Sequence, residues 1–229
     1  KLSMSRWSAP GLVLFALTIT FASFDWLMSL SPHWYSTIYG VYYFSGAVLA
    51  SLSLIIIFSA LVAQSGDVGD AITTEHFHDL GKLLFGFVVF WAYIAFSQLL
   101  LIWMANIPEE TRWFYDRWEN PGWRAMSLFL VFGHFVLPFL FLLPRTIKRF
   151  RPTLVLAAIW IIAIHYVDLH YLVLPAVSPD RVIFSITETL LAVGMLLLLS
   201  SLFFHLLHRE AMVPVRDPHL TQSMAFENF

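Results

Sequence analysis

Cysteine is missing from the sequence, and charged side chains are scarce. Without a thiol, the chain cannot form a disulfide, ligate an iron–sulfur cluster or attach a c-type haem covalently. Charged residues make up 12% of the 229 residues, whereas soluble domains have about 25%. The formal net charge of −2, without a long basic run, gives no support for nucleic acid as a partner. The composition therefore excludes an ordinary water-solvated domain.

The sequence contains long apolar runs, and hydrophobic residues make up 59% of it. A window of about 19 residues finds six runs long enough to cross a bilayer. They lie near residues 8–30, 37–64, 78–105, 123–144, 152–174 and 182–207. Backbone groups cannot stay unpaired in lipid, so such runs must be helices. The sequence predicts an all-α integral membrane protein: a bundle of about six transmembrane helices over 1–209, followed by an irregular polar tail over 210–229.

Lysine and arginine are distributed unevenly between the two sides of such a bundle. With six spans, the side that carries both termini also carries the basic segment RTIKRFR at residues 145–151. The other side holds fewer basic residues, namely Arg112, Arg117, Arg124 and Arg181. Because cytoplasmic loops are enriched in Lys and Arg, we expect both termini to be cytoplasmic.

Ionisable residues within the apolar runs are costly in a membrane and are therefore candidates for function. One group lies at the predicted cytoplasmic entrance of the third span, histidines lie near mid-depth, and carboxylates lie in the outer half. This order predicts a proton pathway through Glu75, His78, Asp79, Lys82, His134, His165, Asp168 and Glu188.

Structural interpretations of the same residues remain open. Glu75–Asp79 and Asp79–Lys82 have helical spacings typical of a surface charge network. His165 and Asp168, three residues apart, could form a structural hydrogen bond. His134 with His165 could hold one b-type haem, although neither helix carries a histidine for a second. No HxxxH or ExxH motif projects into the bundle, so we predict no metal site.

Two long segments resemble a known family: DWLMSLSPHWYSTIYGVYYFSGA at 25–47 and HFHDLGKLLFGFVVFWAYIAFSQLLLIWMANIPEE at 76–110. They are similar to the F subunit of bacterial alternative complex III, within the polysulfide-reductase membrane subunit family. ENPGWR and IHYVDLHYLVLP follow in the same order. The resemblance implies a quinol-oxidising assembly in the bacterial inner membrane, and the chain would be the C-terminal part of a longer subunit.

The resemblance also implies partners and cofactors. The partners would be a homologous membrane C subunit, an iron–sulfur B subunit and haem c subunits, with lipids and a quinone such as menaquinone. Haem c and iron–sulfur clusters would belong to those partners, with no cofactor bound by this chain alone.

Three functions follow as hypotheses from the resemblance and the polar residues. The first is a supporting subunit with a proton pathway. The second is direct quinol oxidation by Asp25 and His33, because the related subunit places an acid and a histidine in this segment. Their aromatic wall would be Trp26, Trp34, Tyr35 and Tyr39. The third is a scaffold for the redox subunits.

Overall fold

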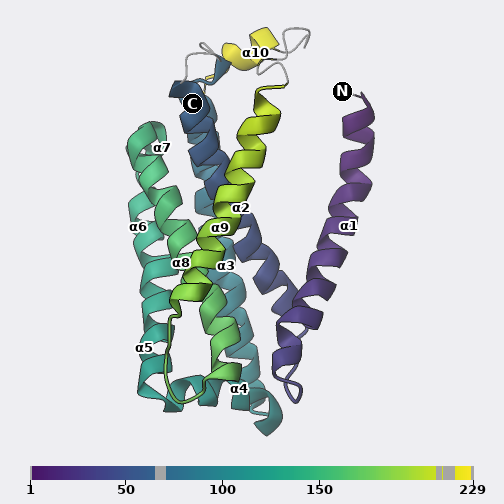
Figure 1. The fold of residues 1–229 in the computed structure, drawn as a ribbon, viewed down its shortest axis with the longest axis vertical. Helices are drawn as coiled ribbons and strands as arrows, with labels where there is room; N and C mark the ends of the chain where they lie inside the picture. The colour runs from purple at the N-terminus through teal and green to yellow at the C-terminus, as the bar shows by residue number, and fades with distance from the viewer. Residues whose placement is uncertain (1, 65–70, 210–212, 214–219, 228–229) are drawn as a thin grey trace.

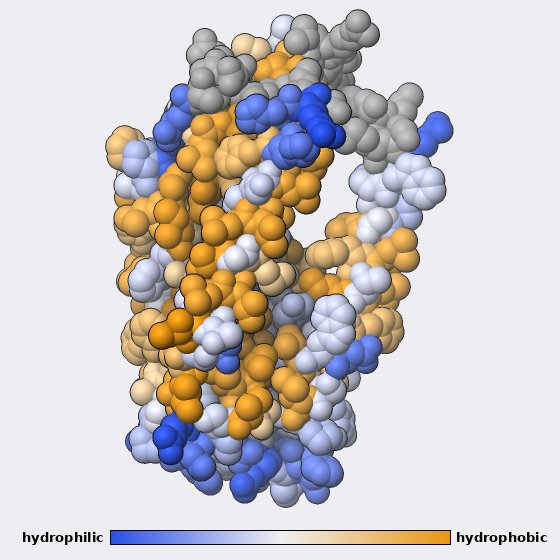
Figure 2. All heavy atoms as spheres, in the orientation of Figure 1, coloured by the Kyte–Doolittle hydropathy of each residue, from blue (hydrophilic) through white to orange (hydrophobic). Residues whose placement is uncertain are grey.

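The computed structural model describes residues 2–64, 71–209, 213 and 220–227, and this part of the chain is helical without a strand. Six of its helical segments are long and apolar enough to cross a membrane. They run along the long axis of the molecule (Figure 1), and Figure 2 shows apolar side chains over the middle with polar ones at both ends. The predicted all-α, multi-pass membrane bundle is confirmed.

The observed spans lie close to the predicted runs. They are α1 (Leu2–Trp26) with the 3₁₀ turn η1 (Met28–Leu30), α2 (Tyr39–Gln64), α3 (Thr74–Ala105), α5 (Pro121–Leu130) continued by η3 (Val131–Val136) and α6 (Leu137–Leu142), α8 (Arg151–Val177) and α9 (Ile186–Leu207). Among the starts of α2–α9, those of α9 and α3 differ most from the predicted runs, and α3 begins before residue 78. There the Thr73 backbone N–H donates to His76 Nδ1 at 3.0 Å, forming a capping box.

In the described residues, three short α-helices lie between or after the spans. The connection between the third and fourth spans contains α4 (Pro108–Glu119), with proline at its first position and two glutamates in its first turn. The basic segment forms α7 (Arg145–Arg149). The tail contains α10 (Leu220–Met224), so its expected irregular course is wrong there; tail residues 210–212, 214–219 and 228–229 lie outside the described residues.

Helix α2 is the centre of the packing, because it contacts α1, α3 and α8. Leu49 and Ile56 of α2, Leu84 of α3 and Leu154 of α8 are fully buried in this core. By contrast, none of the side chains of α9 is buried among the described residues. Helix α1 meets α2 near the end where α4 lies and diverges toward the other end (Figures 1 and 2). We call the two ends of the bundle the α4 end and the α7 end.

The fourth span is interrupted where His134 lies. Pro138 has no N–H and its ring crowds the carbonyl four residues before it, so regular α-helical bonding cannot pass this point. The chain adopts the π-helical turn η3 instead, and the Leu137 N–H bonds to the carbonyl of Phe132. The indole of Trp160 on α8 donates to the Gly133 carbonyl at 2.8 Å. This turn presents Gly133 and His134 as buried residues facing the bundle interior.

Candidate functional site

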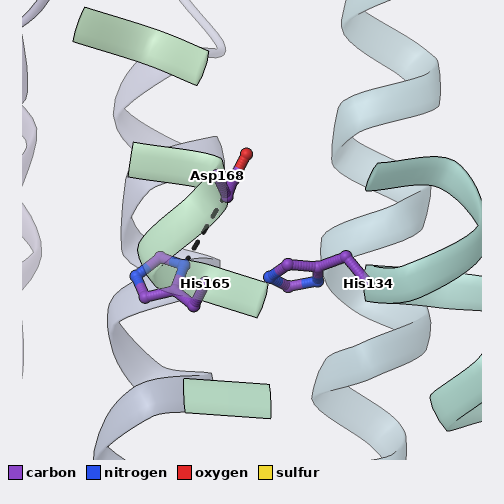
Figure 3. A group of neighbouring side chains, drawn as sticks. All are labelled: His134, His165 and Asp168. Carbon is purple, nitrogen blue, oxygen red and sulfur yellow. Dashed lines mark ion pairs between the residues drawn. The ribbon is translucent and has the colours of Figure 1, made fainter. Parts of the chain in front are cut away.

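A buried hydrogen bond joins α2 to α8 in the interior of the bundle. The Tyr42 hydroxyl donates to Asp168 Oδ1 at 2.5 Å, and Asp168 is 1% exposed. The second carboxylate oxygen, Oδ2, lies 3.7 Å from His165 Nδ1 (Figure 3). A phenol, a carboxyl group and an imidazole therefore follow one another without leaving the interior.

His134 extends this series from the opposite side. Its ring is fully buried and stacks on Trp91 of α3, with 3.8 Å between ring centroids. The His134 and His165 rings are edge to face, 5.9 Å between centroids, and the His134 ring points toward His165 in Figure 3. We call Tyr42, Asp168, His165 and His134 the polar chain.

Several atoms of the polar chain have no hydrogen-bond partner in the described part of the molecule. They are both ring nitrogens of His134, Nδ1 of His165 and Oδ2 of Asp168. Buried polar groups in folded proteins nearly always have a partner, and exceptions call for an explanation such as an ordered water or a functional role. One nitrogen or oxygen atom from each of the three residues lies within 4.8 Å of the other two, so a bridging water or a transferred proton can satisfy the unpartnered atoms.

Gly46 of α2 makes room for the His165 ring. A Cβ atom at position 46 would lie 2.4 Å from Cε1 of His165, closer than real Cβ contacts allow. A glycine is therefore required for α2 and α8 to approach each other with the imidazole between them.

His134, His165 and Asp168 also carry the types of side chain that bind metal ions. His134, His165 and Asp168 each offer one ligand atom, and these atoms lie within 4.8 Å of one another. A preformed tetrahedral zinc site holds its ligand atoms about 3.4 Å apart. The His165–Asp168 separation of 3.7 Å is already wider. A metal would require the side chains to close in, whereas a water fits the spacing as it stands, and the expectation of no metal remains a prediction.

The predicted entrance cluster divides into two parts near the α7 end. Glu75 is buried, pairs with Arg149 of α7, and lies 3.9 Å from His78. Asp79 and Lys82 instead form a half-exposed ion pair at 2.6 Å. The first part ties α3 to α7 in the interior, while the second lies on the surface as the structural interpretation expected.

Glu188 pairs with a residue that the proton pathway prediction omitted. His170 Nε2 of α8 lies 3.2 Å from Glu188 Oε2, and the Tyr166 hydroxyl donates to Thr189 at 3.2 Å. These contacts join α8 to α9. His170 is buried, whereas the Glu188 side chain is 42% exposed.

The residues of the predicted quinol site differ in their burial and surroundings. Asp25 and His33 are both exposed near the α4 end, as are Trp26 and Tyr35. Trp34 is buried: its indole donates to the Glu110 carbonyl at 3.0 Å and stacks on Trp113. Tyr39 is buried and lines a separate cavity, described next.

An aromatic cavity of about 560 Å³ lies between the polar chain and α4. Tyr39, Tyr42, Trp91 and Tyr171 contribute aromatic wall, and Gln98 of α3 contributes an amide. Helix α4 contributes one wall through Thr111, Trp113, Phe114, Tyr115 and Trp118. Because Tyr42 belongs to both, this cavity adjoins the polar chain.

Arg117 fastens α4 over the cavity. Its guanidinium lies 3.4 Å from the Trp113 ring centroid and donates to the carbonyls of Trp113, Tyr171 and Leu172. It is 3% exposed, and burial lowers the pKa of the guanidinium from 12.5 to about 10. The side chain remains a cation at neutral pH and holds α4 against the end of α8.

Sequence reasoning missed Tyr42, Trp91 and Arg117 as parts of these sites. Tyr42 is 126 positions away from Asp168, and nothing local marks the pairing. A signal existed for Gln98, which is a polar residue inside an apolar run. Gly46 can also be read from the sequence, but only the structure shows that the His165 ring of α8 leaves no room for a Cβ atom there.

No model of a known protein family matches the sequence, and no curated protein matches it.

Proposed function

We propose that this chain is an integral membrane subunit of a quinol:electron-acceptor oxidoreductase of the alternative complex III type, where it supports the assembly and contributes a proton pathway. The type of complex rests on the resemblance of segments 25–47 and 76–110. The proton role rests on one observation, the buried polar chain of Tyr42, Asp168, His165 and His134.

Each member of the polar chain can both accept and release a proton. Imidazole and carboxyl groups exchange protons readily, and a phenol can pass one along through its hydroxyl. Asp168 takes part at both oxygens, because Oδ1 accepts from Tyr42 and Oδ2 faces His165. The unpartnered nitrogens of His134 and His165 supply the remaining acceptor positions. The series can thus carry a proton across the middle of the bundle with a water between its histidines.

The ends of the pathway are proposed from the remaining ionisable residues. At the α7 end these are the buried Glu75 and His78, with Asp79 and Lys82 at the surface. At the other end Glu188 lies beside His170. In the proposed orientation the α7 end faces the cytoplasm of a bacterial cell, and both termini lie on that side.

The haem c groups and the iron–sulfur clusters of the assembly would belong to its other subunits. A homologous C subunit, an iron–sulfur B subunit and haem c subunits would surround this chain, and a quinol such as menaquinol would supply electrons. Direct quinol oxidation by Asp25 and His33 remains the alternative. Their exposure and their separation from the aromatic cavity give it less support than the proton role.

The test is the Asp168→Asn variant of the assembly, reconstituted in vesicles. Asparagine keeps the size of the side chain but cannot carry a transferable proton. We expect fewer protons translocated per electron while quinol oxidation continues. The matched control is Asp116→Asn, because Asp116 forms an exposed ion pair with Arg112 on α4. An unchanged proton yield with intact assembly contradicts the pathway, and loss of assembly with a normal yield per complex supports the scaffold hypothesis.

A further inference from the structure

Two buried residues that line the aromatic cavity carry polar groups without a hydrogen-bond partner among the described residues. Tyr39 is 2% exposed and Gln98 is 4% exposed, and both line the cavity. Neither the Tyr39 hydroxyl nor the Gln98 amide makes a hydrogen bond within the described residues. Groups of this kind that line a roomy cavity are suited to receive a ligand that carries hydrogen-bonding atoms.

The rest of the lining indicates a flat, apolar ring. Tyr42, Trp91, Trp113 and Tyr171 surround the space, and aromatic side chains prefer to pack against other aromatic rings in stacked or edge-to-face arrangements. The volume of about 560 Å³ lies within the usual size of small-molecule sites. The cavity can therefore enclose a one- or two-ring head group.

The cavity is open toward the surface that faces lipid. Between α3 and α5 it is bordered by Leu99, Trp103, Leu128 and Val131, which are all exposed on the outside of the bundle. A ligand that enters here comes from the bilayer and can leave an apolar tail between the two helices.

We propose that this cavity binds the head group of a lipid-soluble quinone or quinol, with Tyr39 and Gln98 as hydrogen-bond partners of its ring oxygens. A phospholipid acyl chain fits the apolar walls but leaves both polar groups unsatisfied. The quinone class combines a flat conjugated ring, oxygens at the ring edge and an apolar tail. The site does not include Asp25 or His33, so it differs from the site implied by the family resemblance.

The site and the polar chain share Tyr42, which lines the cavity and donates to Asp168. Their experimental signatures nevertheless differ. Binding of the head group depends on Tyr39 and Gln98, whereas the proposed proton transfer depends on Asp168 and His165. The proposed quinone site can therefore be wrong while the proposed proton pathway is correct, and the reverse also holds.

The experiment uses the purified assembly in lipid nanodiscs with an azido-naphthoquinone that carries a short alkyl tail. After illumination, labelled peptides are identified by mass spectrometry, and affinity is measured by competition with the same quinone lacking the azide. We expect labelling of residues 91–103 or 113–118. Tyr39→Phe and Gln98→Leu should each lower the affinity about tenfold, which corresponds to one hydrogen bond lost to a buried partner.

Matched controls separate the polar contacts from general effects. Tyr93→Phe and Gln64→Leu make the same changes at exposed positions outside the cavity, and should leave the affinity unchanged. Ala95→Phe fills the cavity and should abolish labelling in a variant that still assembles.

Three results would overturn the proposal. They are labelling confined to other segments, an affinity insensitive to both Tyr39→Phe and Gln98→Leu, and labelling of the cavity by a photoreactive phospholipid acyl chain that excess quinone cannot displace. The last result would identify the cavity as a lipid site.

Discussion

Tyr42 and Asp168 are 126 positions apart in the chain and share a buried hydrogen bond of 2.5 Å. The bond joins α2 to α8, the two helices with the most extensive mutual packing in the bundle. It also fixes one oxygen of a carboxyl group whose other oxygen faces a histidine. Asp168 therefore has a structural role, which is to join the two helices, and a proposed chemical role, which is to carry a proton. Variants can separate the two roles.

Tyr42→Phe removes the hydroxyl and keeps the ring. Asp168 then loses the only hydrogen-bond donor that it has in the described chain, and we expect the assembly to be destabilised by about 1–3 kcal/mol. Proton yield should fall as well, because the phenol is the end member of the polar chain. Thermal unfolding and vesicle acidification measure the two effects. Tyr93→Phe, at a residue 64% exposed, is the control and should change neither.

Gly46→Ala adds one methyl group where His165 lies. The new Cβ would start 2.4 Å from the imidazole, so the ring or α2 must move. We expect a loss of about 1–3 kcal/mol in stability, typical of overpacking, together with a reduced proton yield. Gly86→Ala on α3 meets no atom within 4 Å and should be neutral or stabilise the helix by up to about 1 kcal/mol. If the two substitutions changed stability and proton yield equally, the close approach of Gly46 to His165 would not be the cause of the loss.

Arg117→Lys tests how α4 is held over the cavity. Lysine keeps the charge but cannot reproduce the planar fork that reaches carbonyls of α4 and α8 while stacking on Trp113. We expect faster amide hydrogen exchange across residues 108–119 and a stability loss of about 1–3 kcal/mol. Arg124→Lys, an exposed arginine on α5, provides the comparison. Unchanged exchange in Arg117→Lys would mean that other contacts hold α4.

Lys148 predicts a pH dependence of stability in the alkaline range. Its ammonium is buried at the α7 end and donates to the carbonyls of Leu142 and Leu143, and burial lowers its pKa below 10.5. Between the lowered pKa and 10.5 the unfolded chain binds more protons than the folded chain at this residue. Stability should therefore rise with pH in that window. Denaturation of wild type and Lys148→Met across pH 8–11 measures this slope, which should be smaller in the variant.

Glu188→Gln tests the proposed exit of the pathway beside α9. Glutamine can still bond to His170 but cannot carry the proton. We expect a lower proton yield in vesicles with the assembly intact. The same measurement on Glu109→Gln, a glutamate in the first turn of α4, is the control. A wild-type yield in Glu188→Gln would remove this residue from the pathway.

The spans could be predicted from the sequence because lipid imposes one demand, an apolar run of sufficient length, and this demand is local. The run at 37–64 became α2 at Tyr39–Gln64, and the run at 152–174 became α8 at Arg151–Val177. Helix α4 was not predicted because it is amphipathic and too short to span a membrane. Pro108 followed by two glutamates is nevertheless a recognisable helix start.

The candidate site was predictable only residue by residue. Asp168, His165 and His134 were visible as ionisable groups within apolar runs, and ordering by depth placed the two histidines together. Their contacts were not visible, because helix neighbours depend on side-chain packing between distant segments. Depth alone also grouped Glu188 with Asp168, whereas the structure pairs Glu188 with His170 on another face of α8.

Infrared difference spectroscopy of the assembly during quinol turnover would observe the proton on Asp168 itself. The proposed pathway predicts a protonated-carboxyl band in the wild type that shifts in D₂O and disappears in Asp168→Asn, while Asp116→Asn retains it. A spectrum that is the same in the wild type and Asp168→Asn would contradict the pathway, because it would mean that this carboxyl group does not change protonation when the assembly works.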